Sequence, residues 1–144
     1  MLEKSPFVYW DDSFSVGVPL IDEQHKELVR MTNVLFEGCE RGGTGLVSFM
    51  QTIQSATNYA KIHFATEEKY MVLVSYPDYE PHKREHESFV AEVLRQVRLF
   101  EQNKTQPMDF ALFLKNWLLN HIAVSDKKFS PFFIPIADQI VVAG

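Results

Sequence analysis

The chain has 144 residues, 46% of them hydrophobic, which is enough to bury the core of one compact domain over residues 1–144. Its formal net charge is −5 and its Lys and Arg residues are scattered, so we expect no nucleic-acid partner. The apolar run at residues 7–10 is too short for a signal peptide, and no run of about 18 apolar residues predicts membrane insertion, so we expect a cytoplasmic protein.

The first helical pattern follows residues 1–18, which lack a sustained helical period and are expected to form an N-terminal arm packed on the domain. A helix is predicted from residue 21 to the glycine-rich stretch at 38–43, and a second, longer helix from residue 46 to about residue 71. Their inward stripes are Ile21, His25, Leu28, Thr32 and Leu35 in the first helix, and Leu46, Phe49, Ile53, Ala56, Ala60, His63, Glu67 and Met71 in the second.

Prolines mark the two later helices. Tyr76 precedes Pro77 and so disfavours helix, whereas Pro81 suits the first turn of a third helix because it needs no amide partner there. Pro107 can open a fourth helix, which is expected to end or bend at Pro131. Their inward stripes are His82, His86, Phe89, Val93, Val97 and Phe100 in the third helix, and Phe110, Leu114, Trp117, His121 and Val124 in the fourth.

Four such helices joined by short polar breaks predict an all-α fold, an up-down-up-down antiparallel four-helix bundle over about residues 19–130. The N-terminal arm and a short C-terminal segment at 131–144 complete it, and no linker marks a second domain. The single cysteine, Cys39, has neither a disulfide partner nor the spacing of a zinc site, so we expect a small packing residue.

All five histidines lie on stripes that otherwise carry apolar residues, so packing should place their imidazoles in the core. One such histidine is more often a hydrogen-bonded core residue than a ligand, but here every predicted helix contributes at least one. Residues four apart lie within about 40° of each other on a helix, so His63 shares a face with Glu67, and His82 with His86. Imidazoles combined with carboxylates suit zinc, iron, copper or nickel.

Asp126 follows His121 by five residues, a rotation of about 500°, and would point away from it on a regular helix. If both face the core, the helix must widen, so we predict a π-type bulge between them. A buried Glu67 or Asp126 is acceptable beside metal cations, which invert the local electrostatics. The alternative is that both carboxylates lie at the surface, near Glu68 and the lysines at 127–128.

Four segments together carry a resemblance to a known family. Residues 18–25 (VPLIDEQH), 63–67 (HFATE), 82–86 (HKREH) and 121–126 (HIAVSD) resemble the hemerythrin family in content and order, over about residues 10–130. Each segment alone is a weak signal, but the combination leaves no histidine over.

The resemblance implies two iron ions (Fe2+/Fe3+) joined by an oxo or hydroxo bridge, with Glu67 and Asp126 bridging them as well. It implies that one iron is bound by three histidines and the other by two, which are His82, His86 and His121 for the first and His25 and His63 for the second. Three histidines, two carboxylate oxygens and the bridge then give the first iron six donors, and the second only five. The vacancy on the second iron is expected to bind dioxygen.

The walls of that vacancy are expected to be apolar and to come from the residues at the family's pocket positions, although each is equally an ordinary core residue: Phe64, Trp117, Leu118 and Ile122. The family often has a tyrosine where this chain has Phe129, so any hydrogen bond of that hydroxyl is absent. Asp22 and Gln24 are expected at the helix start and in hydrogen bonds behind the ligands rather than as ligands.

The expected function is reversible binding of dioxygen for transport, storage or delivery, and not catalysis, because carboxylate-rich di-iron oxidases carry Glu-x-x-His pairs that this chain lacks. Expected partners are dioxygen and an electron donor or an oxygen-using enzyme. The alternatives are an oxygen or redox sensor, a di-iron enzyme acting on nitric oxide or peroxide, and a metal-free structural bundle.

Overall fold

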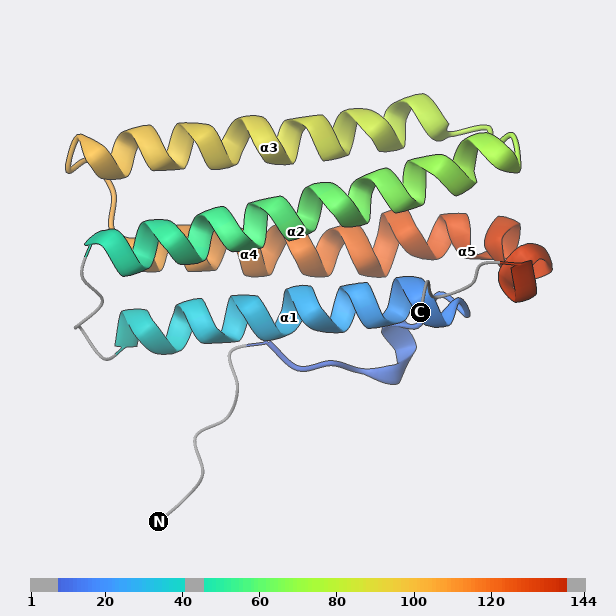
Figure 1. Cartoon of the computed structure of the whole chain (residues 1–144), viewed down its shortest axis with the longest axis horizontal. Coiled ribbons are helices and arrows are strands. Elements are labelled where there is room, and N and C mark those ends of the chain that lie inside the picture. Colours follow the sequence, from blue (N-terminus) through green and yellow to red (C-terminus); the bar gives the residue numbers. More distant parts are fainter. Residues whose placement is uncertain (1–7, 41–45, 140–144) are drawn as a thin grey trace, which may run out of the picture.

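Four antiparallel helices lying side by side make up the molecule (Figure 1), whose computed structural model describes residues 8–40 and 46–139. The long helices are α1 (Pro19–Glu40), α2 (Leu46–Leu73), α3 (Tyr79–Glu101) and α4 (Pro107–Asn120). The last continues through a π-helical turn, η2 (His121–Asp126), into α5 (Lys127–Phe133) and the 3-10 helix η3 (Ile134–Gln139). The predicted all-α, up-down-up-down bundle is confirmed, and the described residues contain no strand.

Local signals place the breaks between the helices. Tyr79 opens α3, so Pro81 lies in its first turn as predicted. α4 begins with a capping box: the Gln106 side chain accepts a hydrogen bond from the backbone N–H of Asp109, and the Asp109 carboxylate accepts one from the backbone N–H of Gln106. Pro107 follows the cap. No helix in the described ranges is long and apolar enough to cross a membrane.

The described part of the N-terminal arm packs on the bundle. The side-chain amide of Asn33 forms two hydrogen bonds with the backbone of Val8. It accepts from the Val8 N–H at 2.7 Å and donates to the Val8 carbonyl at 2.9 Å. Asp22 in the first turn of α1 accepts hydrogen bonds from the Val16 N–H at 2.9 Å and the Ser15 hydroxyl at 2.5 Å. The predicted packing of the arm is therefore confirmed for residues 8–18, while residues 1–7 lie outside the described ones.

The fourth helix was predicted to end or bend at Pro131, and it does not end there, because it runs on through this proline to Phe133. Contacts on both sides of the proline hold it in place. The Ser130 hydroxyl donates to the Val16 carbonyl at 2.6 Å, and Phe129 and Phe133 are buried. Tertiary packing thus outweighs the roughly 3 kcal/mol penalty of a proline inside a helix. Of the expected C-terminal segment, residues 140–144 lie outside the described ones.

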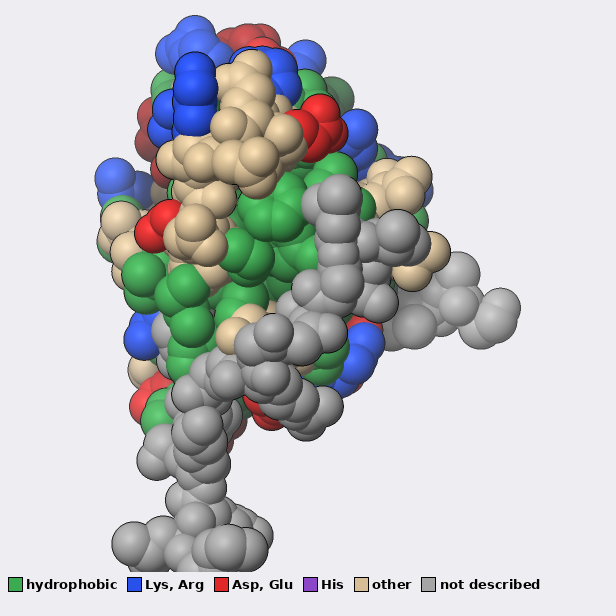
Figure 2. All heavy atoms as spheres, turned by 90° about the vertical axis from the view of Figure 1, so that its left-hand side faces the viewer, with side chains coloured by type: hydrophobic (Ala, Val, Ile, Leu, Met, Phe, Trp, Pro, Cys, Tyr) green, Lys and Arg blue, Asp and Glu red, His purple; other side chains and the backbone are tan. Residues whose placement is uncertain are grey.

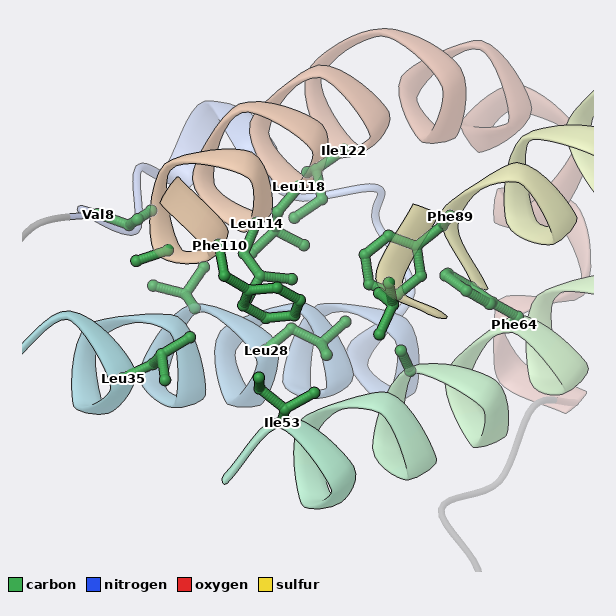
Figure 3. Close-up of a cluster of buried hydrophobic side chains, with 14 of the residues drawn as sticks. Val8, Leu28, Leu35, Ile53, Phe64, Phe89, Phe110, Leu114, Leu118 and Ile122 are labelled. Carbon is green, nitrogen blue, oxygen red and sulfur yellow. The ribbon is translucent and has the colours of Figure 1, made fainter. Parts of the chain in front are cut away.

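The bundle interior holds two separate apolar clusters. The larger cluster contains residues of α1 from Leu28 onward and of α2 up to Phe64 (Figure 3). The smaller cluster contains Ile21 at the start of α1 and Met71 near the end of α2. His25 of α1 and Glu67 of α2 fall between the clusters, so the bundle carries a polar layer between two apolar ones.

One end of the bundle is apolar at its centre. Figure 2 looks onto the end that lies at the left in Figure 1, and hydrophobic side chains gather in the middle of this face, with basic and acidic side chains around them. No described histidine is visible there, in keeping with the burial of all five in the polar layer. Cys39 in α1 packs half-buried against the larger cluster, as predicted.

Candidate metal centre

The seven predicted ligand residues meet in the polar layer. Each is at most 4% exposed, and together they come from α1, α2, α3 and η2: His25, His63, Glu67, His82, His86, His121 and Asp126. The surface alternative for Glu67 and Asp126 is therefore wrong. Burying two carboxylates is unfavourable unless positive charge lies beside them.

The π-helical turn brings Asp126 into this layer. Residues 121–126 form π-helix between α4 and α5, so the predicted bulge is confirmed. As a result Asp126 Oδ1 lies 3.1 Å from His82 Nε2 and 3.2 Å from His121 Nε2. The same turn carries Val124 outward, where it is 50% exposed, so its predicted inward position is wrong.

The donor atoms form two overlapping groups in which every ligand atom lies within 4.8 Å of the others. One group contains three histidines and the other contains two. They consist of Glu67, His82, His86 and His121, and of His25, His63, Glu67 and Asp126.

The two carboxylates lie between the groups. Asp126 turns Oδ1 toward the three-histidine group and places Oδ2 2.8 Å from His25 Nε2. Glu67 places Oε1 2.9 Å from His63 Nε2 and 3.4 Å from His86 Nε2. Each carboxylate therefore faces donors of both groups, which is the position from which it could bridge two cations.

Most of these ligand atoms have no hydrogen-bond partner within the described part of the chain. Buried side-chain nitrogens and oxygens normally have a partner, and among the described residues those that lack one belong to this cluster apart from Gln96 Oε1. His86 and His121 also point their Nε2 atoms at each other across 3.1 Å. Several nitrogen and oxygen lone pairs that converge on one small region can bind a divalent transition metal ion, so the residues present fit such an ion.

Hydrogen bonds on the outer side fix how two of the imidazoles face inward. The Nδ1–H of His63 donates to Gln24 Oε1 at 2.7 Å, and the Nδ1–H of His86 donates to Glu68 Oε2 at 2.9 Å. With the proton on Nδ1, the Nε2 lone pair of each ring points into the cluster, as a metal ligand requires. Gln24 thus lies behind a ligand, as expected.

The charge of the buried carboxylates is offset in part within the cluster. Burial lowers the pKa of His63, so its imidazole is neutral. Burial opposes the charge on Glu67, but the side chains that face it, His121 among them, hold the pKa of Glu67 well below its usual value. Burial also opposes charge on His121, yet the facing carboxylates of Asp126 and Glu67 raise its pKa to about 10. A proton on His121 therefore supplies part of the positive charge that the buried carboxylates need.

Aromatic and aliphatic side chains cover one side of the cluster. Phe64 stacks on His86 with ring centroids 4.0 Å apart, and Trp117 stacks on His121 at 4.5 Å. A small cavity of about 20 Å³ opens beside them, lined by Phe64, Trp117 and Leu118 among others. Ile122, the fourth residue predicted to line a pocket, is fully buried but does not line this cavity.

The pattern of apolar positions does not predict that Glu68 and Glu85 contact the ligand rings. Glu68 bonds His86, and the Glu85 carboxylate lies 3.8 Å from His121 Nδ1. Each directly neighbours a predicted ligand in sequence, which is the only signal that points to them. Which ring a neighbouring carboxylate reaches depends on how the helices are rotated against each other.

Comparisons with known proteins agree with this geometry. Residues 16–133 match the model of the family described as "Hemerythrin HHE cation binding domain". The bacteriohemerythrin of Stenotrophomonas maltophilia is 30% identical over 84% of this chain and 78% of its own length. A hemerythrin-like protein of Naegleria gruberi is 34% identical over 87% of this chain and 92% of its own length. The crystal structure of a wild-type hemerythrin superposes with a TM-score of 0.78 at 27% identity, covering 89% of this chain and 98% of that one. The chain belongs to the hemerythrin family.

Proposed function

We propose that this protein binds dioxygen reversibly at two iron ions held by the seven buried side chains, as a carrier, store or delivery module. The observation that carries the proposal is the unequal division of the donors into a group with three histidines and a group with two. Family membership favours iron and a ligand that binds between or beside two cations. Two ferrous ions would supply the electrons that dioxygen draws on when it binds.

The two-histidine group is the proposed place for dioxygen. Suppose that Glu67 and Asp126 each give one oxygen to one cation and the other oxygen to the second. The cation in the three-histidine group then has one more protein ligand than the cation in the two-histidine group. The latter therefore keeps a free position. Leu28 lies one turn after His25 and Ala60 one turn before His63, and both line the small cavity.

The lining of that cavity supports reversible binding over catalysis. Its two polar residues, Thr32 and Thr57, donate their hydroxyl protons to the carbonyls of Leu28 at 2.9 Å and Ile53 at 2.7 Å. No hydroxyl proton is thus directed at the cavity, and its other lining residues are apolar. Phe64, Trp117 and Leu118 exclude water there, while Ile122 adds to the apolar packing around it. Without a positioned acid, bound dioxygen is released unchanged rather than protonated and reduced.

The proposal is tested by loading the protein with ferrous iron under nitrogen, admitting air and then removing it, while the near-ultraviolet and visible absorption is recorded. We expect two irons per chain and a spectrum that appears in air and disappears on its removal. A spectrum that never reverses would instead support a redox sensor or an enzyme acting on nitric oxide or peroxide, with an electron donor as partner. Failure to bind iron would overturn the proposal altogether.

A further inference from the structure

The Nδ1 atom of His121 lacks a hydrogen-bond partner. The Nε2 atom of this ring points into the cluster, 3.1 Å from His86 Nε2 and 3.2 Å from Asp126 Oδ1. If Nε2 binds a metal, the ring's proton must reside on Nδ1. That atom is buried and has no hydrogen-bond partner in the described part of the chain. A buried N–H without an acceptor is unfavourable by about 1–3 kcal/mol.

The carboxylate of Glu85 is placed to accept that proton. Glu85 belongs to α3, and its Oε2 lies 3.8 Å from His121 Nδ1, within ion-pair range but longer than a hydrogen bond. Its other oxygen, Oε1, accepts a hydrogen bond from the Ser125 hydroxyl at 2.8 Å. Ser125 lies in the π-helical turn, so the bond ties α3 to the element that carries His121 and Asp126.

The surroundings leave Glu85 room to close the remaining distance. Its side chain is 46% exposed, and surface hollows of about 410 and 420 Å³ flank it, each lined by both Glu85 and Ser125. A small rotation about the carboxylate, with Oε1 still held by Ser125, brings Oε2 toward the His121 ring. The carboxylate can therefore move without displacing buried side chains.

We propose that Glu85 is a positioning residue for the three-histidine group, accepting the Nδ1 proton of His121 when Nε2 binds iron, with Ser125 holding the carboxylate in place. The inference rests on the proposed di-iron function. Glu85 then does for His121 what Glu68 does for His86 at 2.9 Å. Hydrogen bonds of this kind orient the ring and make it a stronger donor.

The two groups of ligands become electrostatically unequal as a consequence. Two carboxylates, Glu68 and Glu85, lie behind rings of the three-histidine group. In the two-histidine group, His63 is backed by the neutral amide of Gln24, and His25 Nδ1 has no partner in the described part of the chain. Stronger donors favour the three-histidine position, so it should bind the tighter of the two irons.

The test compares ferrous-iron affinity, by competition with a chelator, among the wild type, Glu85→Ala, Glu85→Gln and Ser125→Ala. The matched control is Glu87→Ala, which removes an exposed acidic side chain two residues away on α3. We expect Glu85→Ala to weaken the tighter of two binding steps by about 10-fold or more. Glu85→Gln keeps an acceptor oxygen and should fall between Glu85→Ala and the wild type, and Glu87→Ala should match the wild type.

A second readout follows the proton itself. In proton NMR spectra of the ferrous protein, a ring N–H signal should exchange faster with solvent in Glu85→Ala and Ser125→Ala, and only shift in Glu85→Gln. If the wild type fails to bind two irons, the proposed function fails. If the wild type binds two irons while Glu85→Ala matches Glu87→Ala in both measurements, the positioning role of Glu85 is overturned and the proposed function stands.

Discussion

Leu118 is a buried leucine that lines the small cavity. It lies one turn before His121 on α4, is 5% exposed, and lines the cavity together with Phe64 and Trp117. Its side chain also belongs to the larger apolar cluster (Figure 3). Shortening it would enlarge a space of about 20 Å³, which is already large enough for one water molecule but is lined mostly by apolar residues.

We therefore predict that Leu118→Ala admits water to the cavity and speeds the irreversible oxidation of the oxygen-bound protein. The variant should also lose about 2–5 kcal/mol of unfolding free energy, as buried leucines do on truncation. Leu112→Ala is the matched control, because Leu112 lies on the same helix and is 43% exposed. The decay of the oxygen-bound spectrum in air gives the rate. Equal rates in both variants would show that Leu118 does not exclude water.

At the scale of the element, the junction between the arm and α1 depends on Gly17. Its φ of 78° lies in the left-handed region, and a Cβ there would approach Ile134 Cγ1 to 3.0 Å. This junction precedes the first turn of α1, where Asp22 bonds Ser15 and Val16.

Gly17→Ala should lower the unfolding free energy by about 1–2 kcal/mol from backbone strain alone, with the Ile134 contact adding to it. Chemical denaturation measures the change. The double variant Gly17→Ala, Ile134→Ala removes the contact but keeps the strain. Gly17→Ala should therefore lower the unfolding free energy by less when it is added to Ile134→Ala than when it is added to the wild type. If the two losses are equal, the contact contributes nothing.

Residue spacing predicts some features of the fourth helix and its neighbours, and others depend on tertiary contacts. The five-residue step from His121 to Asp126 required a wider turn, so the π-helix was predictable from spacing alone. The inward position of Val124 was wrong because the periodic stripe was continued through that turn. The helix does not end at Pro131, one of the two predicted outcomes, because it is held by contacts with residues more than 100 positions earlier, such as the Val16 carbonyl. Glu85 was missed because its reach depends on helix rotation, which no local pattern encodes.

At the scale of the whole molecule, the polar layer lies between two apolar clusters that close the bundle on either side of it. The helices bring together imidazoles and carboxylates that would each be unfavourable alone. Without a cation the cluster relies on protons for its positive charge. The two carboxylates keep the pKa of His121 near 10 although burial opposes its charge. Folding and metal binding are therefore coupled through the protonation state of the layer.

Iron binding at pH 7 should consequently release protons. His121 is protonated there, since its pKa is raised to about 10, and it must become neutral to donate its lone pair to a metal. His63, whose pKa is lowered by burial, is already neutral and contributes none. We expect about one proton released per chain from His121 and an iron affinity that falls as the pH is lowered. An indicator dye in weakly buffered anaerobic solution reports the release when ferrous iron is added, and magnesium, which avoids imidazole, serves as the control. Iron binding without proton release would show that His121 is neutral before the metal arrives, and that the carboxylates of the layer are balanced in another way.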